Sequence, residues 1–205
     1  YTSAGLNMLE SGDYVTPTID GERPHLTKPP ITYWALAGSF ALLGKNEWAA
    51  RLPGALAFVG TGLLIFGLGR RFCPAKPWLP AVIYALSLAP VLGANVISTD
   101  VLLTFFEAAA MYAFVRAWVG QAEIDRRWVR IMWLAWGLAF MTKGPPGLLP
   151  LLAMIVMLGF HDRRALARLF DPIGLATFAV VGFAGFSIKV AQGPGPHGDL
   201  VGYEV

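Results

Sequence analysis

The stretch AARLPGALAFVGTGLLIFGLG, residues 49–69, decides the fold class of this 205-residue chain. After Arg51 it contains no charged residue, and a helix needs about 20 residues to cross the hydrocarbon layer of a bilayer. The whole chain is 56% hydrophobic and only 14% charged, whereas soluble domains carry roughly 25% charged residues. A soluble core of this size could not cover so much apolar surface. The composition therefore favours an all-α integral membrane protein over the alternative, a very apolar soluble helical bundle.

Further apolar blocks recur on the C-terminal side of this stretch and predict a polytopic bundle of about six spans. They cover residues 78–97, 101–119, 128–141, 147–160 and 173–191. The fourth and fifth spans of the six are short, so their flanking residues must contribute to a crossing. On the N-terminal side, residues 31–44 (ITYWALAGSFALLG) suit a helix that lies at the membrane interface. A short helix before it is expected to end at Gly12.

The loops between the blocks fall into two alternating sets that predict the topology. One set is rich in arginine and the other is not, and an excess of Lys and Arg marks cytoplasmic loops. The opening segment, residues 1–48, is therefore expected to be an extracytoplasmic loop with juxtamembrane helices, ahead of a bundle over 49–191. Residues 192–205 then begin a further outer loop, and the chain reads as an internal piece of a longer protein. The arginine-rich loops are 69–77, 116–130 and 161–170, and the outer loops are 95–100, 142–147 and 191–205.

Three charged residues on the predicted outer side are candidates for a functional site. Lys28 precedes two prolines at a helix start, where an amine could bind a phosphate or extend to phospholipid headgroups. Asp100 opens the third span, where a carboxylate could cap the helix or bind a substrate hydroxyl and assist proton transfer. Lys143 precedes Gly144, a common arrangement at a helix C-terminus.

Other ionisable residues give weaker signals. Glu22 and His25 could bind a cation, but their spacing matches no metal-ligand motif. Glu107 is the deepest acid of the third span and needs a partner or water there. The basic loops lack interleaved aromatic residues, and their cytoplasmic placement explains them, so the sequence does not support nucleic-acid binding.

Five motifs occur in a fixed order along the chain. They are LESGDYVTP (9–17), KPPITYW (28–34), NEWAARLPGAL (46–56), STD (98–100) and GLAFMTKGPPGLLP (137–150). In this order and at these intervals they resemble the bacterial members of the dolichyl-phosphate-mannose protein mannosyltransferase superfamily, which includes the lipid A aminoarabinose transferases. The resemblance implies a GT-C fold and spans nearly the whole chain, weakening after about Pro172.

The resemblance also implies an activity and a location. Such glycosyltransferases take a sugar, a hexose or a pentose, from a polyprenyl-phosphate donor. They transfer it to an acceptor on the extracytoplasmic side of the bacterial inner membrane, which can be a protein, lipid A, another glycolipid or a glycan such as a cell-wall polymer. Their principal catalytic aspartate belongs to an acidic pair just before a tyrosine that looks like Tyr1, which places that aspartate upstream of this chain.

Individual positions carry over from the family pattern. Lys28 corresponds to the lysine that holds the donor phosphate, and Asp100 to a second aspartate near the active site. Tyr1 and Lys143 join Lys28 as expected substrate-binding residues, although the role of the TKG loop is open. Thr27 stands where the aminoarabinose transferases have a glutamate that can join a metal site. No metal ligand is therefore assigned, and a requirement for a divalent cation stays open.

Two other functions fit parts of the sequence. A transporter or flippase of polyprenyl-linked substrates would also need many spans, but it would place paired ionisable residues near the middle of the membrane. Only Glu107 approaches that position. A non-catalytic membrane assembly subunit would tolerate substitution in its outer loops and would have no acidic pair before Tyr1.

Overall fold

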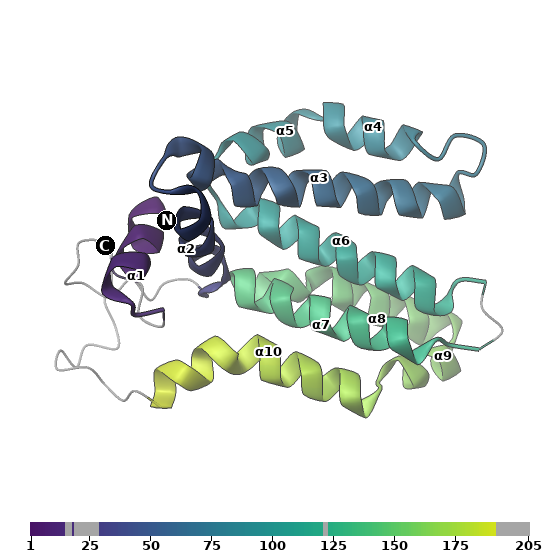
Figure 1. Cartoon of the computed structure of the whole chain (residues 1–205). Coiled ribbons are helices and arrows are strands. Elements are labelled where there is room, and N and C mark those ends of the chain that lie inside the picture. The colour runs from purple at the N-terminus through teal and green to yellow at the C-terminus, as the bar shows by residue number, and fades with distance from the viewer. Residues whose placement is uncertain (15–17, 19–28, 121–122, 192–205) are drawn as a thin grey trace, which may run out of the picture.

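The structure is a computed structural model that describes residues 1–14, 18, 29–120 and 123–191, with the backbone alone described at residues 164, 165 and 185–191. All the elements found in these residues are helical (Figure 1), which confirms the predicted all-α fold. The helices are α1 (Thr2–Ser11), α2 (Ile31–Leu43), α3 (Glu47–Phe72), α4 (Leu79–Leu86), α5 (Leu88–Asn95), α6 (Thr99–Trp118), α7 (Arg126–Lys143), the 3-10 turn η1 (Pro145–Leu148), α8 (Leu149–His161), α9 (Arg163–Leu169) and α10 (Pro172–Ala191).

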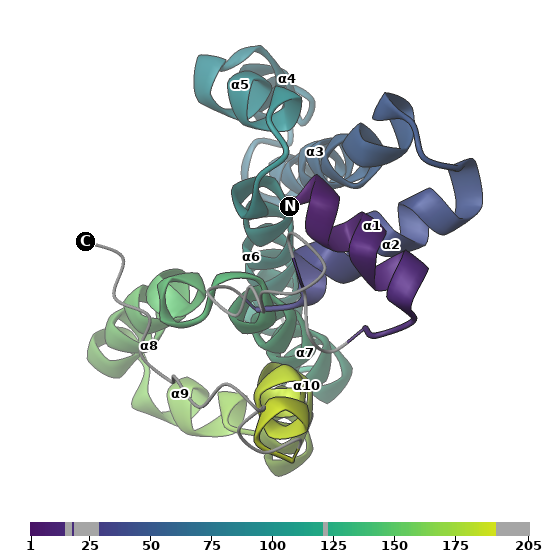
Figure 2. The ribbon, with the colours of Figure 1, turned by 90° about the vertical axis from the view of Figure 1, so that its left-hand side faces the viewer.

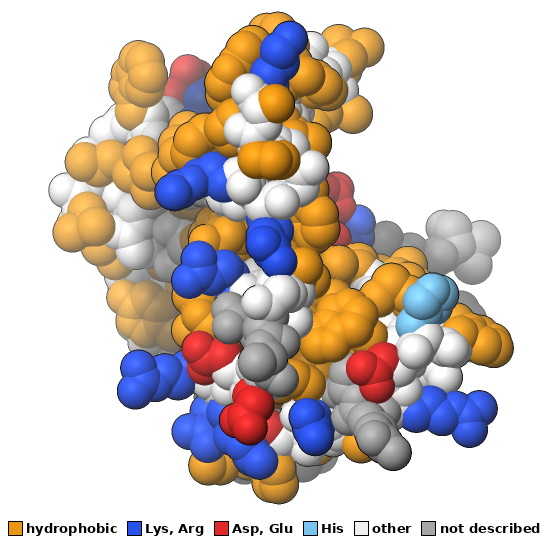
Figure 3. All heavy atoms as spheres, turned by 90° about the vertical axis from the view of Figure 1, so that its right-hand side faces the viewer, with side chains coloured by type: hydrophobic (Ala, Val, Ile, Leu, Met, Phe, Trp, Pro, Cys, Tyr) orange, Lys and Arg blue, Asp and Glu red, His pale blue; other side chains and the backbone are white. Residues whose placement is uncertain are grey.

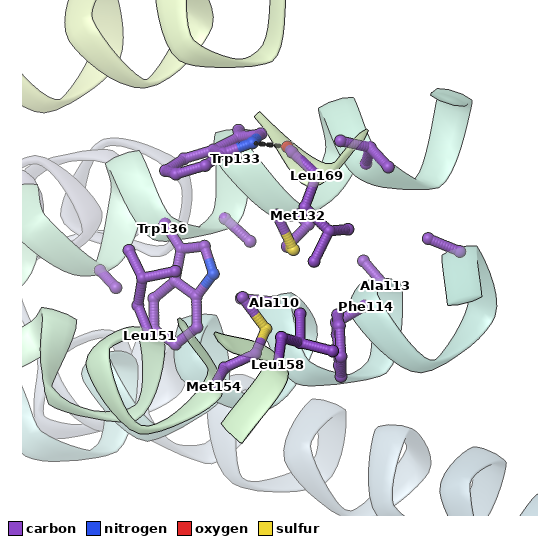
Figure 4. Close-up of a cluster of buried hydrophobic side chains, with 14 of the residues drawn as sticks. Ala110, Ala113, Phe114, Met132, Trp133, Trp136, Leu151, Met154, Leu158 and Leu169 are labelled. Carbon is purple, nitrogen blue, oxygen red and sulfur yellow. Dashed lines mark hydrogen bonds between the residues drawn. The ribbon is translucent and has the colours of Figure 1, made fainter. Parts of the chain in front are cut away.

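The long helices run side by side and pack in the order α3, α6, α7, α10. The main core lies where α6, α7 and α8 meet (Figure 4). Phe114, Trp136 and Leu158, one from each of these helices, are among its buried side chains. Trp133 is also buried, and its indole N–H donates to the carbonyl oxygen of Leu169 at 2.8 Å, which satisfies its polar atom as burial requires.

Helices α1 and α2 form a separate pair at one end of the bundle (Figures 1 and 2). Gly12 ends α1 with a φ of 72°, a conformation that glycine adopts without strain. The predicted helix end at this residue is thereby confirmed. Gly5 allows the close approach of the two helices, because a Cβ at that position would lie 2.8 Å from Cβ of Leu36.

The motif NEWAARLPGAL builds the start of α3. Asn46 is the N-cap, and its side chain accepts the backbone N–H of Ala49 at 2.9 Å. Pro53 has no N–H to donate to the carbonyl of Ala49, four residues earlier. The hydroxyl of Ser39 in α2 donates to that carbonyl instead, at 2.6 Å in a buried position. Pro53 thus leaves the carbonyl of Ala49 without a helical donor, and the hydrogen bond from Ser39 to this carbonyl joins α2 to α3.

Two differences from the sequence-based prediction concern helix boundaries. The block 78–97 forms two helices, α4 and α5, rather than one, because Pro90 cannot donate to the carbonyl of Leu86 and the chain passes through an extended Ser87. The basic loop 161–170 contains a short helix, α9. Among the described residues, α3 and α6 are long and apolar enough to cross a membrane. The count of six spans stays a prediction.

Lys and Arg side chains are spread over the end of the bundle opposite the α1–α2 pair (Figure 3), and most of the described arginines lie there, Arg51 near the start of α3 being an exception. Arg70 and Arg71 lie in the last turn of α3, Arg116 lies in the last turn of α6, and Arg126 begins α7. The two ends therefore differ in charge, as the alternation of loops in the sequence predicts. Which end faces the cytoplasm remains a prediction.

At this arginine-rich end, Asp171 connects α7 to the start of α10. Its side chain is 2% exposed and accepts Arg126 Nη1 at 3.1 Å and Arg130 Nε at 3.2 Å. It also accepts the backbone N–H of Gly174 at 3.0 Å. Burial alone would raise the pKa of Asp171, but these hydrogen bonds and the arginine charges hold the pKa below its ordinary value.

Candidate functional site

The candidate site lies at the end of the bundle that carries α1 and α2, where α6 begins. Ser98 is the N-cap of α6, and its hydroxyl oxygen accepts the backbone N–H of Asp100 at 3.3 Å. Asp100 is therefore the second residue of the helix, and the expectation that Asp100 is the cap is wrong. Its carboxylate projects from the first helical turn, where the helix dipole favours a negative charge.

Lys143 pairs with this carboxylate. Its ammonium contacts Oδ1 of Asp100 in an ion pair, although 43 residues separate the two along the chain. Lys143 is the last residue of α7, and Gly144 ends that helix at a φ of 74°. Because α6 and α7 pack side by side and run in opposite directions, the end of α7 reaches the start of α6. Each charge also lies at the helix terminus whose dipole favours it.

The ion pair is accessible from outside the bundle. The side chain of Asp100 is 60% exposed and that of Lys143 is 36% exposed. Such a pair in water contributes little to stability, so its carboxylate and ammonium remain available to another polar group. This arrangement can bind a substrate hydroxyl at Asp100 and a negative charge at Lys143.

Lys143 also interacts with a second carboxylate on α6. Glu107 lies seven residues after Asp100, on the same face of the helix, and is half-buried. Lys143 is the charged residue whose field acts on it. Lys143 thus acts on both acids of α6, through an ion pair at Asp100 and through its charge alone at Glu107, and the partner expected for Glu107 stays a prediction.

The other sequence candidates lie elsewhere. Tyr1 precedes α1 and its ring lies 5.7 Å from the ring of Tyr33 in α2, within the α1–α2 pair. Burial and, to a lesser extent, Tyr1 raise the pKa of Tyr33 to about 12, so the phenol of Tyr33 stays protonated at neutral pH. Lys28 lies outside the described residues, as do Glu22 and His25.

No group of three or more metal-ligating side chains occurs within the described part of the chain. The Asp100–Lys143 pair is the feature that sequence reasoning missed. Each residue was a candidate by itself, and the topology placed both on the outer side, but no local pattern indicates that they touch.

The fold and this charged pair at one end of it define a class of protein, a helical membrane protein with an exposed polar site at the end of its bundle. The chain belongs to the dolichyl-phosphate-mannose-protein mannosyltransferase family, whose model matches residues 27–188. The resemblance drawn from the five motifs is thereby confirmed.

Relatives and solved structures agree with this assignment. An uncharacterized protein of Aquifex aeolicus is 35% identical over 72% of this chain and 29% of its own length. An undecaprenyl phosphate-alpha-4-amino-4-deoxy-L-arabinose arabinosyl transferase of Edwardsiella ictaluri is 32% identical over 88% of this chain and 33% of its own length. The chain thus spans about a third of the length of these relatives.

The fold matches ArnT from Cupriavidus metallidurans. The apo structure of that protein superposes with a TM-score of 0.87 over 100% of this chain and 39% of ArnT, at 22% identity. Its structure bound to undecaprenyl phosphate gives a TM-score of 0.82 over 95% of this chain and 37% of ArnT, at 24% identity. At this identity the likeness concerns the fold, and it confirms the expected GT-C architecture.

Proposed function

We propose that the protein is a membrane glycosyltransferase that moves a sugar from a polyprenyl-phosphate donor to an acceptor on the extracytoplasmic side of a bacterial inner membrane. The accessible Asp100–Lys143 pair at one end of the bundle carries the proposal. The Edwardsiella relative is named as an arabinosyl transferase that uses an undecaprenyl phosphate sugar, and the ArnT structure is described as bound to undecaprenyl phosphate. The donor sugar is a pentose or hexose, and the acceptor is a protein, lipid A, another glycolipid or a glycan.

The proposed reaction exchanges one bond at the anomeric carbon of the sugar. An acceptor hydroxyl attacks this carbon, the bond to the phosphate oxygen breaks, and polyprenyl phosphate leaves with both bonding electrons. Asp100 accepts a hydrogen bond from a sugar or acceptor hydroxyl and orients it. An aspartate upstream of Tyr1, implied by the family pattern, takes the proton of the attacking hydroxyl.

Cations stabilise the charge that develops on the leaving phosphate, which is where electrostatic stabilisation contributes most to the rate. Lys28 is assigned to this role from the family pattern. Lys143 holds Asp100 in place and adds a second positive charge near the phosphate. Tyr1, in the outer loop, contributes to substrate binding. Residues 1–48 then form an extracytoplasmic unit above the bundle of residues 49–191.

The test offers the full-length protein in membranes a series of radiolabelled polyprenyl-phosphate sugars, one at a time. Loss of label from the carrier with wild type, and not with Asp100→Asn expressed at the same level, would support the transferase and begin to identify the sugar. If the labelled carrier crosses the bilayer without losing its sugar, the protein is a flippase and the proposal is wrong. If neither happens with any donor, the proposal is also wrong.

A further inference from the structure

At the arginine-rich end of the bundle, α3 and α6 end side by side and bring two arginine side chains to one corner (Figure 1). The guanidinium of Arg71, in the last turn of α3, occupies the space that a side chain at Gly120 would fill. Arg116 lies in the last turn of α6, four residues before Gly120. Two positive charges from separate helices therefore lie at the same corner.

Aromatic rings hold Arg116 in place at this corner. Its Cζ lies 5.0 Å from the centre of the Trp128 ring, in the first turn of α7, which is a cation–π contact. The ring of Tyr112 meets Trp128 edge-on at 5.8 Å. A Cβ at Gly67 of α3 would lie 2.6 Å from the ring of Tyr112, so Tyr112 packs against α3 as well. Three helices thus fix one arginine whose side chain is exposed.

Neither arginine has an acidic partner among the described residues. Arg126 and Arg130, at the same end, share the buried carboxylate of Asp171, whereas Arg71 and Arg116 form no ion pair with a described side chain. Several Lys and Arg side chains of this end have no acidic side chain beside them (Figure 3). Basic residues are expected at a cytoplasmic end, but two guanidiniums fixed at one corner repel each other, and an anion between them removes that repulsion.

An exposed apolar row on α3 leads to this corner. Large side chains recur there at intervals of three and four residues, on one face of the helix, and each is 37–67% exposed. They are Leu56, Val59, Leu63 and Phe66. The row continues four residues further to Arg70, which is next to Arg71. An acyl chain lying along this row would bring its headgroup to the two arginines.

We propose that this corner binds an anionic phospholipid, with Arg71 and Arg116 as ligands of the phosphodiester and the apolar row of α3 in contact with an acyl chain. A guanidinium can bind two phosphate oxygens through parallel hydrogen bonds. Basic sites between membrane helices on the cytoplasmic side bind anionic headgroups such as that of cardiolipin. The lipid belongs to the surrounding leaflet and is not a substrate, because the corner and the Asp100–Lys143 pair lie at opposite ends of the bundle.

The test measures lipid binding to the purified full-length protein by native mass spectrometry in a neutral detergent. Cardiolipin and phosphatidylglycerol, which are anionic, are compared with phosphatidylethanolamine, which is zwitterionic. Wild type should bind the anionic lipids about tenfold more tightly or better. The anionic lipids should also raise its unfolding temperature, because a ligand that binds only the folded state stabilises that state.

Three variants of the two arginines separate a built site from general attraction. Arg71→Gln and Arg116→Gln should each weaken binding of the anionic lipids about fivefold to tenfold. Arg116→Lys keeps the charge but loses the planar group that stacks on Trp128 and binds two oxygens, so it should weaken binding about threefold to fivefold. Each arginine is exposed, so the lipid-free variants should unfold at the wild-type temperature.

Arg168→Gln is the matched control. Arg168 is an exposed arginine in the last turn of α9, at the same end of the bundle but away from α3 (Figures 1 and 2). Its loss removes the same charge without touching the corner, so the affinity should stay within about twofold of wild type.

Wild-type affinity of Arg71→Gln and Arg116→Gln for both anionic lipids would overturn the proposal. An equal loss in Arg168→Gln would overturn it too, because the attraction would then come from the net charge of the whole end, and so would unchanged affinity in Arg116→Lys. If one glutamine variant does not fold, the other and Arg116→Lys decide. None of these readouts depends on sugar transfer, so the result holds whether or not the proposed function is correct.

Discussion

Replacing either member of the Asp100–Lys143 pair should affect activity far more than stability. Asp100→Asn keeps the shape of the side chain and removes its charge, and Lys143→Met keeps most of its length. The two side chains are 60% and 36% exposed, so water already screens the pair. Exposed ion pairs contribute about 0.2–1 kcal/mol, and the charge at each helix end adds about 0.3–1 kcal/mol. Each variant should therefore lower the free energy of unfolding by about 1–2 kcal/mol at most.

The effect on transfer should be larger. A positioned acid or base contributes about 10² to 10⁴ in rate, and a hundredfold loss corresponds to about 2.7 kcal/mol of transition-state stabilisation. Asp100→Asn should therefore lower kcat/KM by about a hundredfold or more. Lys143→Met should lower it less, because the lysine acts on the substrate partly through Asp100. In the double variant the two losses should not add, since the residues act as one unit.

The assay combines thermal unfolding of the purified full-length protein with transfer kinetics in the same detergent. Lys45→Gln serves as the control, because the Lys45–Glu10 pair is also exposed, at 54% for each side chain. It should show the same small loss of stability and no loss of transfer. The reasoning would be refuted if Asp100→Asn lowered stability by more than about 3 kcal/mol, or if it transferred sugar at the wild-type rate.

Three further predictions concern the scaffold, each checked by unfolding of the purified protein. Ser39→Ala leaves the buried carbonyl of Ala49 without its donor and should lower the free energy of unfolding by about 1–3 kcal/mol. An unchanged unfolding temperature would contradict the role of Ser39 as the donor that replaces the missing N–H of Pro53. Gly5→Ala places a Cβ 2.8 Å from Cβ of Leu36 and should cost about 1–3 kcal/mol, whereas Gly38→Ala, where a Cβ meets nothing within 4 Å, should not. The lowered pKa of Asp171 stabilises the fold fully above its unfolded pKa of about 3.9, and this contribution is lost as the pH falls through the lower folded pKa. Asp171→Asn should reduce the free energy of unfolding at neutral pH and should make it fall less steeply as the solution is acidified. If stability depended on acidic pH in the variant as it does in wild type, the assignment would be contradicted.

Much of the fold follows from local sequence. Gly12 ends α1 and Asn46 begins α3, because a left-handed residue and a capping side chain act within a single turn of helix. Apolar blocks mark the long helices in the same local way. The helix break at Ser87 could also have been predicted from the sequence, because Pro90 lies inside the block 78–97. It was missed because prolines are tolerated inside membrane helices when neighbours satisfy the freed carbonyl, as Ser39 does for Pro53.

Contacts between residues far apart along the chain could not be predicted from the sequence. The pairing of Asp100 with Lys143 depends on how far α7 extends beside α6, and the Asp171 contacts depend on the register between α7 and α10. A shift of one turn, about 5.4 Å, would separate either pair while leaving every local pattern intact. Composition and spacing carry no information on this register, because the side chains that set it are apolar and interchangeable in size.

The two aspartates at opposite ends of the bundle show why Asp100, and not Asp171, is the candidate for chemistry. Asp171 is 2% exposed, and three donors bind its oxygens, so a substrate has no access to it. Ser98 caps the helix in place of Asp100, so the helix needs this aspartate only for a dipole contribution of about 0.3–1 kcal/mol. Its carboxylate has one ion-pair partner and stays 60% exposed. A carboxylate that contributes little to the stability of the fold and is held by a lysine at the accessible end of a membrane bundle is suited to a reaction at the membrane surface.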